Sequence, residues 1–264
     1  MFTTQTTYST GSSPDSLQAV HVNGYDKPDI IVANAGSNNV GVLLNIGNGT
    51  FSAETTYSTG SGSAPYSVVA VDVNGDAQCS TIFINQTTYS TGSNPDTLKA
   101  ADVNGDGKPD IIVANYGSNN VGVFLNIGND TFSAQATYST GSGSGPYYVA
   151  AADVNGDGKP DIIVANAGSN NVGVFLNIGS GTFAAQTTYL TGTGPAEVAV
   201  ADVNGDGKPD IIVANTNSNN TGVLLNIGNG TFSAQTTYLT GTSPGSVARG
   251  KEGNPGIRVF RENP

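Results

Sequence analysis

The sequence has few of the residues from which disulfide frameworks and catalytic sites are built. Its 264 residues include one cysteine, Cys79, and one histidine, His21. A single cysteine excludes an internal disulfide framework. One histidine leaves nothing from which to assemble a Ser-His-Asp or Cys-His catalytic set. The glutamates stand apart from other acidic residues, so pairs of carboxylates occur only inside a repeated loop.

Basic residues and long apolar runs are also scarce. Nine Lys and Arg stand against 20 Asp and Glu, for a formal net charge of −11. Nucleic acids and anionic membrane surfaces attract basic patches, so we expect neither as a partner. No apolar run reaches membrane-spanning length, so we expect no membrane insertion. The first eight residues have no basic region and no apolar core, which predicts either an intracellular protein or a piece of a longer secreted chain.

Amphipathic helices are not indicated anywhere in the sequence. Apolar residues instead recur in short, β-branched clusters, and Gly, Asn, Ser and Pro separate these clusters. Clusters of this length are typical of strands, and the residues between them are typical of turns. The sequence therefore predicts an all-β protein.

What the sequence does contain is one nine-residue motif, Asp-Val-Asn-Gly-Asp-Gly-Lys-Pro-Asp, at 102–110, 153–161 and 202–210. Positions 1, 3, 5 and 9 carry side-chain oxygens, and glycine at position 6 allows the left-handed backbone of a sharp turn. Ca²⁺ takes six to eight oxygen ligands, and the backbone carbonyl at position 7 supplies a further one. The carboxylates of one motif would repel each other without a cation. The motif therefore predicts three Ca²⁺ sites.

The ligands that this pattern assigns follow the same positions in each copy, with lysine contributing its backbone carbonyl. They are Asp102, Asn104, Asp106, Lys108 and Asp110; Asp153, Asn155, Asp157, Lys159 and Asp161; and Asp202, Asn204, Asp206, Lys208 and Asp210. The alternative is a hairpin turn in which these side chains only cap backbone N–H groups. Mg²⁺ is disfavoured because a flexible loop with many oxygens suits the larger ion.

The motif differs from an EF-hand, which has glutamate at position 12 and runs into a helix. Here position 12 is valine, within a run Asp-Ile-Ile-Val-Ala-Asn that reads as a strand. Each motif is thus expected to connect two strands of a hairpin. Near-complete ligation by the protein leaves no open coordination position, so we expect the metal to brace the fold and not to catalyse.

The motif belongs to a longer internal repeat. Its first positions fall at His21, Asp72, Asp102, Asp153 and Asp202, with spacings of 51, 30, 51 and 49 residues. A full repeat contains four strand-like segments, as in 183–189, 196–201, 210–215 and 221–226. Four strands in about 50 residues are typical of a β-propeller blade, and a β-solenoid with shorter coils is the alternative. We expect one domain, 1–264, with repeat units at 2–50, 51–84, 85–131, 132–182, 183–231 and 232–264.

Two of the six units are defective. The first keeps only Asn23 and Asp29 of the ligand pattern. The second is about 21 residues short, has Ser80 at position 9, and is expected to bind metal weakly or not at all. Past 202–210, the equivalent position is Lys251, where no site is expected. The weak second site would use Asp72, Asn74 and Asp76.

The repeats resemble the FG-GAP or VCBS-type repeats of the family that includes the integrin α-subunit propeller. The resemblance rests on the motif 102–110, the strand 110–115 and the segment 121–132. It implies four-stranded antiparallel blades, Ca²⁺ on the loop between the two innermost strands, and an extracellular or cell-surface location. Relatives commonly have seven blades, so an open fragment of a seven-bladed ring is the alternative to a ring closed by Phe2–Ser9.

Two classes of function remain. The first is a monomeric, non-catalytic binding or adhesion module that recognises protein or glycan. The second is a propeller-scaffold polysaccharide lyase or hydrolase, and a degraded fragment without activity is a third option. Nearly identical repeats without polar insertions favour the first class. The tyrosines that recur with the repeat are expected to pack and not to contact a ligand, whereas Tyr147 and Tyr148 depart from the repeat and could line a surface near the central channel.

Overall fold

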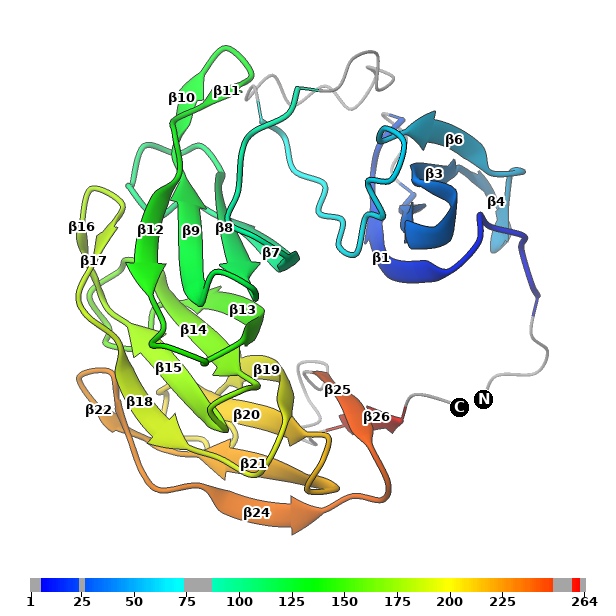
Figure 1. The fold of residues 1–264 in the computed structure, drawn as a ribbon. Helices are drawn as coiled ribbons and strands as arrows, with labels where there is room; N and C mark the ends of the chain where they lie inside the picture. The colour runs from blue at the N-terminus through cyan, green and yellow to red at the C-terminus, as the bar shows by residue number, and fades with distance from the viewer. Residues whose placement is uncertain (1–5, 24–26, 74–86, 249–257, 262–264) are drawn as a thin grey trace. The chain divides into compact units, whose positions relative to one another are not determined.

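A computed structural model describes residues 6–23, 27–73, 87–248 and 258–261 (Figure 1). The chain divides into two compact units, Met1–Tyr89 and Ser90–Pro264. Each unit is built from strands, and the expected single domain over 1–264 stays a prediction. Within the described residues, no helix is long and apolar enough to span a membrane.

Unit 1 contains one four-stranded antiparallel sheet, which we call blade 1. Its strands lie in sequence order across the sheet, from the first, which we call the inner strand, to the last, the outer strand, and a small hairpin lies between the third and the fourth. The sheet consists of β1 (Pro14–Val20), β2 (Asp29–Asn34), β3 (Asn39–Leu43) and β6 (Thr55–Ser58), with the hairpin β4 (Asn45–Gly47) and β5 (Thr50–Phe51) and the 3-10 turn η1 (Ala35–Ser37).

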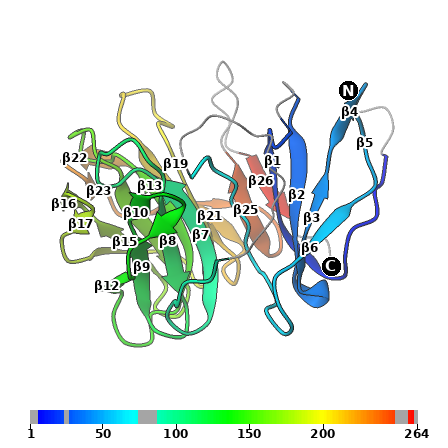
Figure 2. The same ribbon diagram turned by 90° about the horizontal axis from the view of Figure 1, so that it is seen from above.

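Unit 2 repeats this arrangement three times, in sheets that we call blades 3, 4 and 5 after the repeat unit of their inner strand (Figures 1 and 2). Blade 3 has β7 (Pro95–Ala101), β8 (Asp110–Asn115), β9 (Asn120–Phe124) and β12 (Ala136–Ser139), with the hairpin β10 (Asn126–Gly128) and β11 (Thr131–Phe132). Blade 4 has β13 (Pro146–Ala152), β14 (Asp161–Asn166), β15 (Asn171–Phe175) and β18 (Thr187–Leu190), with β16 (Asn177–Gly179) and β17 (Thr182–Phe183). Blade 5 has β19 (Pro195–Ala201), β20 (Asp210–Asn215), β21 (Asn220–Leu224) and β24 (Thr236–Leu239), with β22 (Asn226–Gly228) and β23 (Thr231–Phe232). A further pair, β25 (Pro244–Ala248) and β26 (Arg258–Arg261), follows.

The predicted all-β class with four-stranded antiparallel blades is confirmed. The repeat and the blade are out of phase, however, because each repeat gives its first strand to the preceding blade. Residues 136–139 lie in the fourth repeat unit but form β12, which pairs with β9 of blade 3. Successive repeats are therefore linked by strand pairing as well as by packing.

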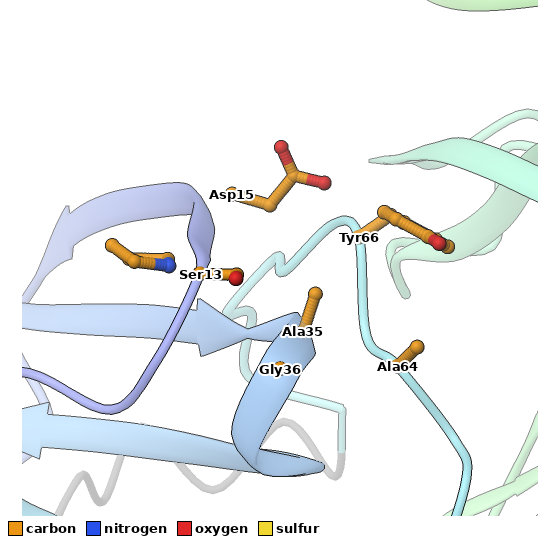
Figure 3. A pocket seen from close by; sticks show the side chains of 7 residues that line it. Ser13, Asp15, Ala35, Gly36, Ala64 and Tyr66 are labelled. Carbon is orange, nitrogen blue, oxygen red and sulfur yellow. The ribbon is translucent and has the colours of Figure 1, made fainter.

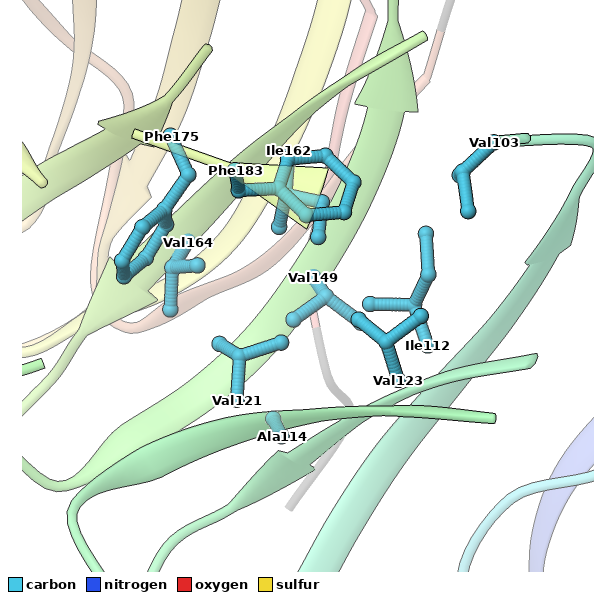
Figure 4. Close-up of a cluster of buried hydrophobic side chains, with 10 residues drawn as sticks. All are labelled: Val103, Ile112, Ala114, Val121, Val123, Val149, Ile162, Val164, Phe175 and Phe183. Carbon is cyan, nitrogen blue, oxygen red and sulfur yellow. The ribbon is translucent and has the colours of Figure 1, made fainter. Parts of the chain in front are cut away.

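Neighbouring blades of unit 2 pack through β-branched and aromatic side chains (Figure 4). The sequence Asp-Ile-Ile-Val-Ala-Asn is buried on both faces in β14 because blades cover it on either side. Burial of a side chain such as isoleucine contributes about 1.5–3 kcal/mol. The core between blades 3 and 4 consists of Val103, Ile112, Ala114, Val121, Val123, Val149, Ile162, Val164, Phe175 and Phe183.

Three of the recurring tyrosines pack against phenylalanine rings, in agreement with the packing role predicted for them. The ring of Tyr138 in β12 lies edge-on to Phe183 of the next blade at 5.3 Å, and Tyr189 meets Phe232 at 5.5 Å. In unit 1, Tyr8 meets Phe51 in the same way at 5.6 Å. Residues 6–9 of the expected strand Phe2–Ser9 form no strand, and its remaining residues lie outside the described part of the chain.

Candidate functional site

The three predicted metal loops join the inner two strands of blades 3, 4 and 5. In the first loop, Gly105 and Gly107 have φ of +80° and +81°, and a Cβ added at either would meet no atom within 4 Å. Glycine is thus required here by backbone conformation, not by crowding. The other two loops have nearly the same angles at the equivalent glycines.

Position 1 of each loop folds its carboxylate onto the backbone of the loop itself. Asp102 Oδ1 accepts hydrogen bonds from the N–H groups of Gly105 (2.7 Å) and Asp106 (3.2 Å), and Oδ2 accepts one from Gly107 (2.8 Å). Asp153 repeats all three bonds at the same distances. A carboxylate has about four lone-pair sites, so these oxygens keep some capacity to bind a cation.

Position 5 carries a partner that the sequence motif did not suggest. Asp106 Oδ1 accepts the N–H of Lys108 at 2.9 Å, and the Lys108 ammonium lies 3.5 Å from Oδ2. The corresponding Lys–Asp distances are 2.9 Å and 3.1 Å in the next two loops. The backbone bond from Lys108 lowers the pKa of Asp106. Lysine at position 7 therefore acts through its ammonium group as well as its backbone, at a carboxylate that a metal would use.

Position 9 is the buried end of the loop. Asp161 is fully buried, and its two oxygens accept the N–H groups of Val154 (2.9 Å) and Asn177 (2.7 Å). Burial raises the pKa of Asp161. Asp29 of blade 1, whose loop has lost most of the motif, holds Val22 and Asn45 in the same way at 3.0 Å and 2.7 Å. This aspartate thus organises the fold even where the rest of the ligand pattern is missing.

The loops 102–110 and 153–161 also lie against the next blade. The Asn177 side chain donates to the carbonyl of Val103, in the loop of blade 3, at 2.8 Å, and to that of Pro160 at 3.0 Å. Asn226 bonds Val154 in the same way at 2.8 Å. The order of a loop is therefore coupled to the contact between two blades, which the sequence did not reveal.

The donor set of the loops fits Ca²⁺, because it contains only carboxylate, amide and carbonyl oxygens. Within the described ranges, no three His, Cys, Asp or Glu side chains are placed to hold a metal ion. Any site would thus combine amide and backbone oxygens with the carboxylates. Of the weak second site, Asp72 is described and exposed, whereas Asn74 and Asp76 lie outside the described residues, as does Cys79.

The residues that depart from the repeat lie at the start of the inner strands. Tyr147 is 41% exposed and contacts Tyr116 edge-on at 6.5 Å. The neighbouring Tyr148 has the Lys99 ammonium 5.0 Å from its ring centre. Burial, and then Glu197, raise the pKa of Tyr148. Tyr147 is thus part of an exposed aromatic surface, as its departure from the repeat suggested, whereas Tyr148 is largely covered.

A comparison with models of known families shows which family this chain belongs to. A model of the FG-GAP-like repeat matches residues 21–78, 102–164, 153–213 and 202–250. The chain belongs to the FG-GAP-like repeat family. The resemblance predicted from the motifs is confirmed. A comparison with curated proteins found no match.

Two solved lyases show the same architecture at low sequence identity. A streptogramin B lyase has a TM-score of 0.63 and 13% identity, over 96% of this chain and 84% of the lyase. A catalytically inactive virginiamycin B lyase from Staphylococcus aureus, with quinupristin, has a TM-score of 0.58 and 14% identity, over 94% of this chain and 84% of the other. A lectin from Agrocybe aegerita that recognises non-reducing terminal N-acetylglucosamine has a TM-score of 0.45 and 22% identity, over 86% of this chain. The FG-GAP-like chain spans 53% of that lectin's length.

Proposed function

We propose that this FG-GAP-like protein is a calcium-stabilised, non-catalytic binding module for protein or glycan at the cell surface or outside the cell. The observation that carries the proposal is the position of the three loops. Two of them, 102–110 and 153–161, place a set of oxygen donors next to the contact between two blades. A cation there would stabilise the surface that the blades present together.

Bound Ca²⁺ would neutralise the carboxylates of each loop and compete with the lysine ammonium at position 5. The residues that would hold it are those at positions 1, 3, 5 and 9, together with the position 7 carbonyl. Asp102 and Asp106 already shape their loop through hydrogen bonds to its N–H groups. Binding would therefore require limited rearrangement, which favours affinity.

The recognition role is supported by where the repeats differ. Blades 3, 4 and 5 share their loops and second strands, whereas the inner strands begin differently. Tyr147, exposed beside Tyr116, lies in that variable segment. Identical framework elements with variable exposed residues are what a binding scaffold needs, since function resides in sites placed on a fold.

The first prediction is the calcium stoichiometry. Calorimetric titration of chelator-treated protein should show three strong sites, at 102–110, 153–161 and 202–210. The variant Asp106→Ala should leave two, because it removes a charged ligand from one loop only. A site at 100 times its Kd stabilises the fold by about 2.7 kcal/mol, so melting in excess Ca²⁺ should fall accordingly.

The matched control is Asp130→Asn, which removes a charge from an exposed hairpin residue outside the loops. It should keep three sites and an unchanged melting temperature. The calcium assignment would be contradicted by a titration without strong sites. It would also be contradicted if Asp130→Asn lost a Ca²⁺ site as Asp106→Ala does.

The second prediction concerns partners. Glycan-array and cell-surface binding should appear in Ca²⁺ and disappear in EDTA, because the presenting surface depends on ordered loops. Reproducible turnover of a polysaccharide, abolished by an acid-to-amide change outside the loops, would refute the non-catalytic role.

A further inference from the structure

The first residue after the proline that opens each inner segment varies more than the framework around it. Twice along the chain, one repeat has an aspartate at this position and the next repeat has a tyrosine. These pairs are Asp15 with Tyr66 and Asp96 with Tyr147, and the following repeat has Ala196. Each pair comes from two consecutive repeats. The first pair lies in unit 1 and the second lies at the equivalent position in unit 2.

The first of these positions is hollow (Figure 3). A pocket of about 410 Å³ that opens to solvent lies there, entirely within unit 1, and we call it the cavity. Tyr66, 54% exposed, and the exposed Asp15 stand on either side of it, with Ala35 between them. The lining residues are Ser13, Pro14, Asp15, Ala35, Gly36, Ala64 and Tyr66.

The second position is filled. Tyr116 stands where blade 1 has Ala35, and its ring lies edge-on to Tyr147 at 6.5 Å. Gly145 stands where unit 1 has Ala64, and a Cβ on Gly145 would approach the Tyr116 ring to 2.9 Å. A pair of alanines in unit 1 thus keeps open the space that tyrosine and glycine close in unit 2.

We propose that the cavity between Asp15 and Tyr66 is a saccharide-binding site, an inference that rests on the binding role proposed above. A volume of this order suits a small molecule. The Tyr66 ring offers an apolar surface to the C–H face of a sugar, and its hydroxyl can still hydrogen-bond. The Asp15 carboxylate and the Ser13 hydroxyl can accept hydrogen bonds from sugar hydroxyls.

Other small ligands fit the residues less well. The net charge of −11 disfavours anionic ligands. Quaternary ammonium ligands are held by cages of several aromatic rings, whereas this cavity is lined by one. A neutral, hydroxyl-rich ligand therefore matches the lining best.

The test uses the full chain in Ca²⁺ and a panel of methyl glycosides of N-acetylglucosamine, galactose, mannose, glucose and fucose. Ligand-observed NMR titration should show at least one glycoside binding at one site per chain. Tyr66→Ala should weaken that binding at least about tenfold, because it removes the apolar contact. Asp15→Asn should weaken it less, because one of the two acceptor oxygens remains.

A second variant fills the cavity by copying unit 2. In Ala35→Tyr/Ala64→Gly, the new ring has the room that Gly145 gives Tyr116, so the fold should be kept and binding lost. The matched control, Ala167→Tyr, places the same ring at the equivalent turn of blade 4 and should bind normally. Conversely, Tyr116→Ala should open the position between Asp96 and Tyr147 and raise the stoichiometry from one to two.

Failure of this site can be told apart from failure of the binding role. The saccharide site is overturned if no glycoside binds with Kd below about 10 mM, if tetramethylammonium binds instead, or if binding survives the filled variant. The wider binding role stands if Ca²⁺-dependent recognition of a glycan array or a cell surface persists in that filled variant.

Discussion

At the scale of single residues, the aspartate at position 9 has two roles that the sequence could not separate. In the sequence, this aspartate is one of the four side-chain ligands of the predicted cation-binding motif. In the folded protein it is fully buried, and it joins the start of the loop to the strand pair that follows. Burial of a side chain depends on residues far away in sequence, which is why the motif could not reveal it.

This dual role gives the third prediction. Asp161→Asn and Asp29→Asn should each lower the free energy of unfolding in EDTA by about 1–3 kcal/mol, because one buried N–H loses its acceptor. In excess Ca²⁺, Asp161→Asn should lower the free energy of unfolding by more than it does in EDTA, because the loop of Asp161 keeps the full ligand pattern. Asp29→Asn should lower it equally in both buffers, because its loop does not. Urea unfolding in both buffers measures the difference.

The exposed variant Asp130→Asn is again the control and should be neutral in both buffers, as most surface substitutions are. Equal behaviour of Asp29→Asn and Asp130→Asn in EDTA would show that the buried carboxylate is dispensable to the fold.

At the scale of elements, strands and loops follow closely from local sequence. Asp-Ile-Ile-Val-Ala-Asn is β-branched and bounded by turn residues, and it forms the second strand of every complete blade. The hairpin 226–232 likewise turns the chain as its glycines predict. Contacts between elements were not predictable in this way, because the Asn177 bond to Val103 joins residues 74 positions apart.

That bond gives the fourth prediction. Asn177→Ala should weaken Ca²⁺ binding at 102–110 about tenfold, because the loop loses a hydrogen bond that restrains Val103. The clean measurement uses a background with Asp153→Ala and Asp206→Ala, in which 102–110 is the one complete loop left.

The comparison background carries Asp102→Ala and Asp153→Ala, so that 202–210 is intact. There Asn177→Ala should leave the affinity unchanged, since this asparagine contacts the other loops. A similar loss in both backgrounds would mean that the substitution perturbs the whole unit and not one neighbouring loop.

At the scale of the whole molecule, the N-terminal residues carry a contact that belongs to the repeat. Tyr8 meets Phe51 edge-on, and the Phe51 N–H donates to the Tyr8 hydroxyl at 3.1 Å. Tyr138 and Phe183 make the equivalent ring contact between blades 3 and 4. Residues near Tyr8 thus give blade 1 the contact that a preceding blade's outer strand would give. Ring closure by Phe2–Ser9 itself stays a prediction.

The fifth prediction follows from this contact. Tyr8→Ala should destabilise blade 1 by about 1–2 kcal/mol, through loss of the ring contact and of a hydrogen bond. Hydrogen exchange should show faster opening of β3 and β6 than of β14 and β15. Tyr238→Ala is the control, because Tyr238 is the equivalent tyrosine but is 54% exposed. This variant should lower the stability only slightly. Unchanged protection of blade 1 in Tyr8→Ala would refute the role given to the N-terminal residues.

The identity of β2, β8, β14 and β20 has a consequence for how the chain reaches its fold. Each has the sequence Asp-Ile-Ile-Val-Ala-Asn, so β8 would meet the same neighbours and register if it paired with β15 instead of β9. Only the shorter connection favours the native partner, by about 2 kcal/mol of loop-closure entropy. Refolding from denaturant should therefore populate exchanged pairings, within one chain at low concentration and between chains at high concentration. Synthesis from the N-terminus, which offers β9 to β8 before β15 exists, avoids that competition.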